Sequence, residues 1–170
     1  AGSIVPALGY VMLIILLNDF LLEPLVELLV GEGIKLESFD GLRGNLSNLL
    51  IMLTIMWVMA AFGEEFFFRG YVMNRLAILL GNSRVSWIIA LLLSSAIFGI
   101  VHGYQGISGM ITTGIVGLFL GLVFMNNRNN LFVAILVHGI YDTYGLTMIY
   151  FGNELVVKNI MIDIYQSLIQ

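Results

Sequence analysis

The sequence contains no cysteine, only two prolines and only two histidines among its 170 residues. Without cysteine, the chain has no disulfide, no thiolate nucleophile and no zinc site built on cysteine. Charged residues make up only 11% of it, and acidic residues outnumber basic ones by 11 to 7. No basic patch is therefore available for a phosphate backbone, and we expect no nucleic-acid partner.

Apolar residues are in large excess. They form 59% of the chain, and the mean hydropathy is +1.00, whereas soluble domains are about 45–50% apolar and about 25% charged. A chain of this length has too little polar surface to enclose so many apolar side chains. We therefore expect an all-α, multi-pass protein of the cell membrane, with the lipid bilayer covering the apolar excess.

Long runs without charge indicate the number of membrane crossings, since one crossing needs about 20 mostly apolar residues. The 43 residues between Arg84 and Arg128 contain no Asp, Glu, Lys or Arg, which is enough for two crossings. Three further runs are 1–18, 44–63 and 129–141, the last interrupted only by a histidine. The sequence thus predicts about five transmembrane helices in a single membrane domain, residues 1–170. Because the chain starts at Ala1 rather than Met and shows no signal-peptide pattern, we expect further helices upstream.

Turn-forming residues divide the chain into helices expected at about 4–22, 46–80, 85–102, 108–125 and 131–150. The ring of Pro24 removes a backbone donor and is predicted to end the first helix. The acidic, glycine-containing residues 23–48 are predicted to form an amphipathic segment and loop at the water interface. The second helix is predicted to continue through the charged residues near position 65, because no Gly/Pro cluster interrupts it. Gly99-x-x-x-Gly103 and Gly117-x-x-x-Gly121 are interpreted as faces for close helix packing.

Six ionisable residues lie in or beside these predicted spans, and they include both histidines of the chain. They are Glu64, Glu65, Arg69, His102, His138 and Asp142. A charge near the bilayer centre costs about 2.5–3.5 kcal/mol on insertion scales, so such residues are functional candidates by default. Their convergence on three separate helices favours a functional site over isolated packing roles.

Helical spacing predicts how the acidic residues divide their roles. Glu65 and Arg69 are four residues apart in the order that favours an ion pair. Glu64 points about 100° away from Glu65 on a helical wheel, at 3.6 residues per turn. One carboxylate can therefore be neutralised while Glu64 stays free to act as a base.

The histidines also stand at informative spacings. His138 and Asp142 are four residues apart, so the carboxylate can orient the imidazole. Phe98 lies one turn before His102 and is expected to pack beside its ring. A carboxylate with two imidazoles can deprotonate a water, direct it at a carbonyl and stabilise the oxyanion, which is the chemistry of peptide hydrolysis. For a shared site, the helix at 85–102 must be strongly tilted or enter the bilayer later than its first residue.

A zinc site is an alternative use of the same groups. Glu64, His102 and His138 are two imidazoles and one carboxylate, which can hold zinc with an open position. The free base would then be Glu65, and Arg69 would lose its partner. We therefore favour metal-free glutamate catalysis with no required cofactor.

The strings EEFFFR at 64–69, FGIVH at 98–102 and HGIYD at 138–142 resemble three motifs, EExxxR, FxxxH and HxxxN/D. These motifs are typical of the CAAX protease and bacteriocin-processing (ABI) family of intramembrane peptidases. Order, spacing and helix placement all match, and the resemblance covers about residues 47–150. The chain is similar to the prokaryotic members, in which Asp is common at the last motif position.

The resemblance implies a multi-pass protease that cuts a peptide or protein substrate, which in some members is lipidated, inside the membrane. By motif position, it implies that Glu64 is the general base and that Glu65 and Arg69 support it. His102 and His138 become the water-orienting and oxyanion groups, with Asp142 as the partner in the last motif. The prenyl proteases of the family have Asn at this last position, a neutral donor, whereas an ionised Asp is an acceptor.

Other classes of membrane protein share some of these features. GISG at 106–109, with Ser108 and His138, is similar to the serine motif of rhomboid proteases, but it leaves Glu64 and its neighbours without a role. A non-proteolytic membrane protein, such as a bacteriocin immunity factor or a scaffold, could use the same pocket for binding. A transporter also uses buried acids, yet no inverted repeat is visible. The sequence indicates no oligomeric state.

Overall fold

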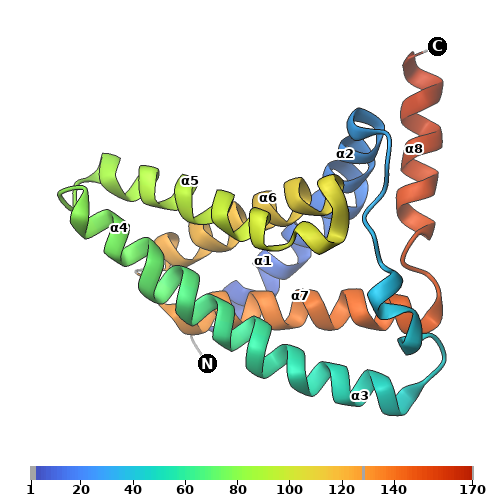
Figure 1. Ribbon diagram of the computed structural model, residues 1–170, viewed down its shortest axis with the longest axis horizontal. Coiled ribbons are helices and arrows are strands. Elements are labelled where there is room, and N and C mark those ends of the chain that lie inside the picture. The colour runs from blue at the N-terminus through green and yellow to red at the C-terminus, as the bar shows by residue number, and fades with distance from the viewer. Residues whose placement is uncertain (1–2, 128, 170) are drawn as a thin grey trace.

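The computed structural model describes residues 3–127 and 129–169 (Figure 1). Within these ranges the chain has no strand, and five helices are long and apolar enough to cross a membrane. They are Ile4–Val30, Leu46–Leu79, Arg84–Val101, Gly103–Asn126 and Leu131–Phe151. The predicted all-α, multi-pass membrane class is confirmed. Arg128, in the turn predicted between the last two spans, lies outside the described residues.

The first helix is longer than predicted. It consists of α1 (Ile4–Leu17), the π-helical segment η1 (Asn18–Leu22) and α2 (Glu23–Val30). The prediction that Pro24 ends this helix was wrong, because the helix continues from η1 through Pro24 into α2. The wide turn of η1 before it allows the helix to continue.

The interfacial connector is correspondingly shorter than the predicted 23–48. It covers residues 31–45 and contains the 3₁₀ segment η2 (Glu37–Leu42). Arg43 in this connector pairs with Glu154 beyond the last span. The connector is therefore fastened to the part of the chain that follows the fifth membrane helix.

The second membrane helix runs without a break for 34 residues, as predicted. It consists of α3 (Leu46–Ile55), η3 (Met56–Glu64), η4 (Phe66–Met73) and α4 (Asn74–Leu79), and η3 and η4 are π-helical. Asn45 caps its start by accepting a hydrogen bond from the backbone of Asn48. The EEFFFR string lies where these π-helical turns meet, and such turns are frequent at functional sites. This helix is called the long helix below.

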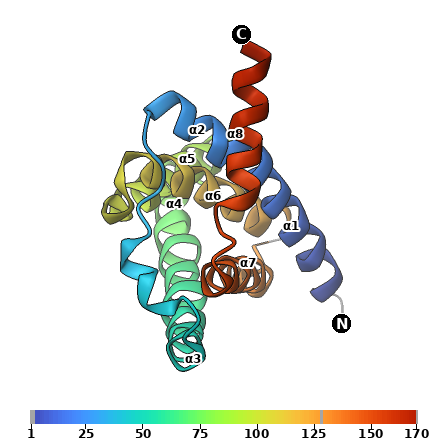
Figure 2. The same ribbon diagram turned by 90° about the vertical axis from the view of Figure 1, so that its right-hand side faces the viewer.

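Three more helices complete the bundle around the long helix and α1. A helical hairpin is formed by α5 (Arg84–Val101) and α6 (Gly106–Asn126), joined by the 3₁₀ turn η5 (Gly103–Gln105). The fifth span, α7 (Leu131–Phe151), lies in the middle and contacts α1, α6 and the long helix (Figures 1 and 2). Apolar clusters on both flanks of α7 make it the centre of the fold.

A last helix, α8 (Val156–Ile169), was not predicted from the sequence. It projects from the bundle and packs on η1 and α2 (Figure 2). Lys158 on its inner face is buried, and its Nζ lies 2.8 Å from Glu27 Oε2 and 3.8 Å from Glu23 Oε1. This charge contact, absent from any local sequence pattern, explains where α8 docks.

The α5–α6 interface depends on small residues, as the glycine spacing predicts. A Cβ on Gly99 would lie 2.5 Å from the backbone oxygen of Met110 and 3.0 Å from the Cα of Gly114. Both obstacles are backbone atoms, so a side chain at position 99 forces the two helices apart. A Cβ on Gly114 would meet its nearest atom, the Ser95 backbone oxygen, at an ordinary 3.5 Å.

This difference gives a paired prediction for stability. We expect Gly99→Ala to lower the free energy of unfolding by about 1–3 kcal/mol, the usual cost of overpacking. Gly114→Ala, on the facing helix, is the matched control and is expected to change it little. Thermal unfolding of both variants in detergent measures the difference, and equal melting temperatures would contradict the close approach.

Candidate active site

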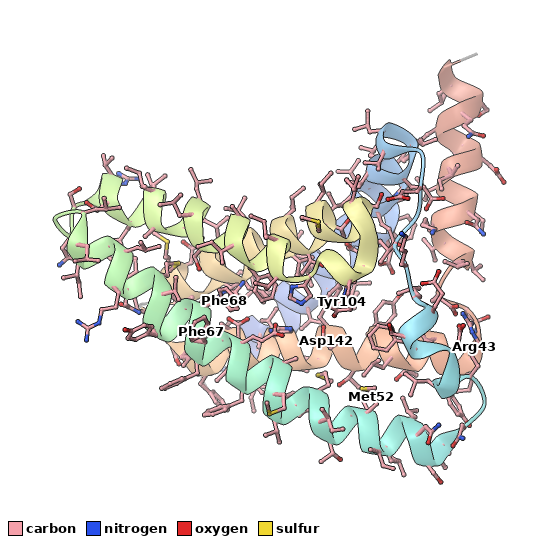
Figure 3. The ribbon with its side chains drawn as sticks, viewed as in Figure 1. Arg43, Met52, Phe67, Phe68, Tyr104 and Asp142 are labelled. Carbon is pink, nitrogen blue, oxygen red and sulfur yellow. The ribbon has the colours of Figure 1, made fainter. Side chains whose placement is uncertain are left out.

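Three segments of the bundle bring the six candidate residues together. The long helix contributes Glu64, Glu65 and Arg69 from its π-helical part. His102 caps the end of α5, and α7 contributes His138 and Asp142 from its third and fourth turns. Figure 3 shows Asp142 in the central region where α7, the long helix and the end of α5 approach one another. The predicted gathering of both histidines near the acidic motif is therefore present.

The buried half of the site is an ion pair with a third member. Arg69 Nη1 donates to Glu65 Oε1 at 2.7 Å, and both side chains are almost fully buried. His138 Nδ1 lies 2.8 Å from the same Glu65 oxygen. The predicted Glu65–Arg69 pair is confirmed, but its contact with His138 was not predicted, because the two residues are 73 positions apart.

Arg69 also connects three helices. Its Nη2 donates to the backbone oxygen of Gly117 on α6 at 2.8 Å. Its guanidinium carbon lies 4.6 Å from the ring centroid of Phe98 on α5, a distance suited to a cation–π contact. Arg69 therefore orients Glu65 and fastens the hairpin to the long helix.

His102 is held in one orientation by its own helix. Its Nδ1 lies 2.7 Å from the backbone oxygen of Phe98, one turn earlier. A carbonyl oxygen only accepts hydrogen bonds, so the Nδ1 must carry the proton. The Phe98 ring packs against the imidazole with centroids 4.7 Å apart, as the spacing predicts. The other nitrogen, Nε2, faces Glu64 Oε1 at 4.0 Å.

His138 lies between two carboxylates. Its Nε2 is 3.3 Å from Asp142 Oδ2, which is the predicted four-residue contact, while its Nδ1 faces Glu65. Carboxylate oxygens accept hydrogen bonds, so each contact needs a proton. Either a doubly protonated imidazole or a protonated Asp142 satisfies both, and in each case one proton lies between His138 and Asp142.

Accessibility separates the six side chains into two groups. The exposed fraction of the side chain is 30% for Glu64, 26% for Asp142 and 13% for His102. In the other three residues it is 6% or less. A water or a peptide can thus reach the first group but not the second. Of the two neighbouring glutamates, Glu64 is the accessible one and Glu65 is the buried partner of Arg69.

Two further side chains at this place were not predicted. The ring of Tyr104, on η5, lies 5.8 Å from the His102 ring, and the Tyr104 hydroxyl accepts a hydrogen bond from Gln105 at 3.2 Å. The only sequence signal for them is their position directly after the second motif. They stand at the exposed rim of the site.

The groups proposed for zinc do not form a free ligand set. Both ring nitrogens of His138 already face carboxylate oxygens. Across the described 3–127 and 129–169, no group of three or more His, Asp or Glu side chains is arranged to hold a metal ion. Zinc binding by Glu64, His102 and His138 therefore requires His138 to give up one of its contacts.

The serine alternative is not supported by this arrangement. Ser108 is almost fully buried, and its hydroxyl donates to the backbone oxygen of Glu32 in the connector. The hydrogen bonds of His138 go to Glu65 and Asp142. Ser108 therefore fastens the connector to the start of α6, and its hydroxyl is not paired with an imidazole base.

A bundle of membrane helices around an accessible carboxylate and two oriented imidazoles has the character of a membrane-embedded hydrolase. Comparison with known families agrees: the model for "Type II CAAX prenyl endopeptidase Rce1-like" matches residues 46–144, more than half of the chain. The chain belongs to this family and is a CAAX-type intramembrane protease. No curated protein and no solved structure matches it. The family's proteases depend on glutamate and are generally metal-independent.

Proposed function

We propose that this protein hydrolyses a peptide bond with a water that Glu64 activates and His102 positions. The observation that carries the proposal is the pairing of the one accessible motif glutamate with an imidazole of fixed orientation, Glu64 Oε1 to His102 Nε2 at 4.0 Å. Because Nδ1 is committed to Phe98, the neutral ring presents an unprotonated Nε2 on this side. A water at about 2.8 Å from each atom donates one hydrogen to each.

Hydrolysis then needs two proton transfers, both through Glu64. Glu64 takes one proton as the water oxygen bonds to the peptide carbonyl carbon, which forms a tetrahedral intermediate with a negative oxygen. When the C–N bond breaks, Glu64 returns the proton to the leaving amine. Water is consumed, one peptide becomes two, and no metal is required in this scheme.

The proton between His138 and Asp142 supports the oxyanion side of the reaction. His138 Nε2 and Asp142 Oδ2, the two atoms that share this proton, are 3.3 Å apart. This is a long contact, from which a stronger acceptor can draw the proton. Glu65 and Arg69 hold the other edge of the imidazole, so the ring does not turn away. Preorganised donors of this kind act where charge develops in the transition state.

We propose a CAAX-type C-terminal peptide as the substrate, on the basis of the family match. The lipid-facing surface beside the site is strongly apolar, with Phe66 and Phe67 exposed on the long helix and Ile100 on α5. A prenyl group on the substrate would place the peptide at membrane depth. The substrate is therefore presented from the bilayer, with its peptide part at Glu64.

Cleavage of quenched fluorogenic peptides by the purified protein in detergent or liposomes tests this function. The set contains a farnesylated CAAX peptide, the same peptide without the lipid, and a scrambled peptide. We expect cleavage of the farnesylated peptide, unchanged after treatment with a metal chelator. Loss of activity on chelation that zinc restores would move the protein to the metalloproteases, and binding without cleavage would favour a non-proteolytic role.

A further inference from the structure

We infer that Tyr104 contacts the substrate, and that its hydroxyl donates a hydrogen bond to the carbonyl oxygen of the peptide bond that is cleaved. This inference rests on the proposed function and adds a residue outside the three motifs. The Tyr104 ring lies 5.8 Å from the His102 ring, at an angle of 36° to it. Tyr104 is 58% exposed, so a bound peptide can reach it.

The phenol proton is free to be donated. Gln105 Nε2 donates to the Tyr104 oxygen at 3.2 Å, which uses the acceptor side of the hydroxyl. In the described part of the chain no side chain or carbonyl accepts the Tyr104 proton in return. A phenol is donor and acceptor at once, so this hydroxyl retains one donor for a ligand.

Gln105 holds the phenol in place and is itself fixed on several sides. Its Oε1 accepts from the Thr113 hydroxyl at 2.9 Å, which assigns the amide nitrogen to Tyr104. Its backbone N–H donates to the His102 oxygen at 2.9 Å, and its backbone oxygen accepts from Lys35 at 3.0 Å. The turn that carries Tyr104 is thereby tied to α6, to the motif histidine and to the connector.

Gly109 permits this arrangement. A Cβ at this position would collide with the Cβ of Gln105, so only glycine lets the Gln105 side chain lie across the first turn of α6. The close approach positions a side chain that hydrogen-bonds to both Thr113 and the phenol. The structure thus contains a chain of contacts, Thr113 to Gln105 to Tyr104, that ends at the rim of the site.

Beside the proton that His138 and Asp142 share, an oxyanion can take a second hydrogen bond from a neutral donor. Asp142 stands where the prenyl proteases of the family have Asn, and an ionised carboxylate has no proton to offer an oxyanion. The His102 ring, which lies 5.8 Å from the Tyr104 ring, has its Nε2 4.0 Å from Glu64 Oε1, so the phenol stands beside the pair that is proposed to hold the water. Tyr104 supplies the donor that an amide at position 142 would otherwise provide.

The test is the steady-state kinetics of Tyr104→Phe, which removes the hydroxyl and keeps the ring. We expect kcat to fall about 10²–10³-fold, the usual effect of losing one oxyanion donor, with little change in KM or melting temperature. Tyr71→Phe is the control, because Tyr71 is also exposed but lies on the long helix. This variant should keep parental kinetics. In an Asp142→Asn background the effect of Tyr104→Phe should shrink, because the new amide restores a donor.

A second readout does not depend on turnover. A peptide phosphonate, whose charged tetrahedral group imitates the intermediate, should bind Tyr104→Phe more weakly than the parent, while the uncleaved peptide binds both alike. Parental kcat in Tyr104→Phe, or a change in KM alone, overturns the inference and leaves the proposed function intact. No cleavage by the parent protein, with equal phosphonate binding by both proteins, overturns both.

Discussion

Glu64→Gln is expected to abolish peptide cleavage while the protein stays folded. The amide has nearly the same shape but cannot take a proton from water, and loss of a general base costs about 10²–10⁴-fold in rate. The fold should not suffer, because Glu64 is 30% exposed and His102 Nε2 is as far as 4.0 Å from its carboxylate. The measurement is kcat/KM with the farnesylated peptide, together with a thermal unfolding curve.

Two comparisons sharpen this result. Asp163→Asn, an exposed carboxylate on α8, is the matched control for loss of one negative charge and should keep full activity. Glu65→Gln should behave differently from Glu64→Gln, because it weakens a buried pair with Arg69 and is expected to lower stability as well as rate. Full activity of Glu64→Gln would remove this residue from the mechanism and give its role to another base.

The difference between the two neighbouring glutamates was predictable from the sequence, because it depends only on local helical geometry. The four-residue spacing of Glu65 and Arg69 holds in the π-helical segment as it would in an α-helix. The contact of Phe98 with His102 is local for the same reason. The membrane spans were equally accessible to prediction, since their apolar length is fixed by the thickness of the bilayer.

Contacts that depend on how helices pack were not predictable in this way. The hydrogen bond between His138 and Glu65 joins α7 to the long helix, and no spacing within either helix indicates it. The docking of α8 through Lys158 on the acids of α2 has the same character. Pro24 shows the opposite limit: its ring was correctly interpreted as losing a donor, but the π-helical turn before it lets the helix continue despite that loss.

Arg69→Ala is expected to have the largest effect on stability. It would leave the carboxylate of Glu65 buried without its cation, and breaking a buried ion pair costs about 3–5 kcal/mol. It also removes the hydrogen bond to the Gly117 oxygen and the contact with the Phe98 ring, so the α5–α6 hairpin loses a fastening to the long helix. We expect both a marked fall in melting temperature and loss of cleavage.

Arg75→Ala is the matched control for this prediction, because Arg75 is exposed six residues further along the same helix and packs over Tyr71. Its loss should change neither stability nor activity.

Arg69→Lys is the more discriminating variant: it keeps the charge, but a single ammonium on a flexible stem does not reproduce two directed hydrogen bonds and a stacked plane. We expect it to retain more stability than Arg69→Ala and still lose rate, since an imidazole whose carboxylate partner is misplaced no longer holds its proton toward Asp142. An Arg69→Ala protein as thermostable as the parent would show that the buried charge of Glu65 needs no partner.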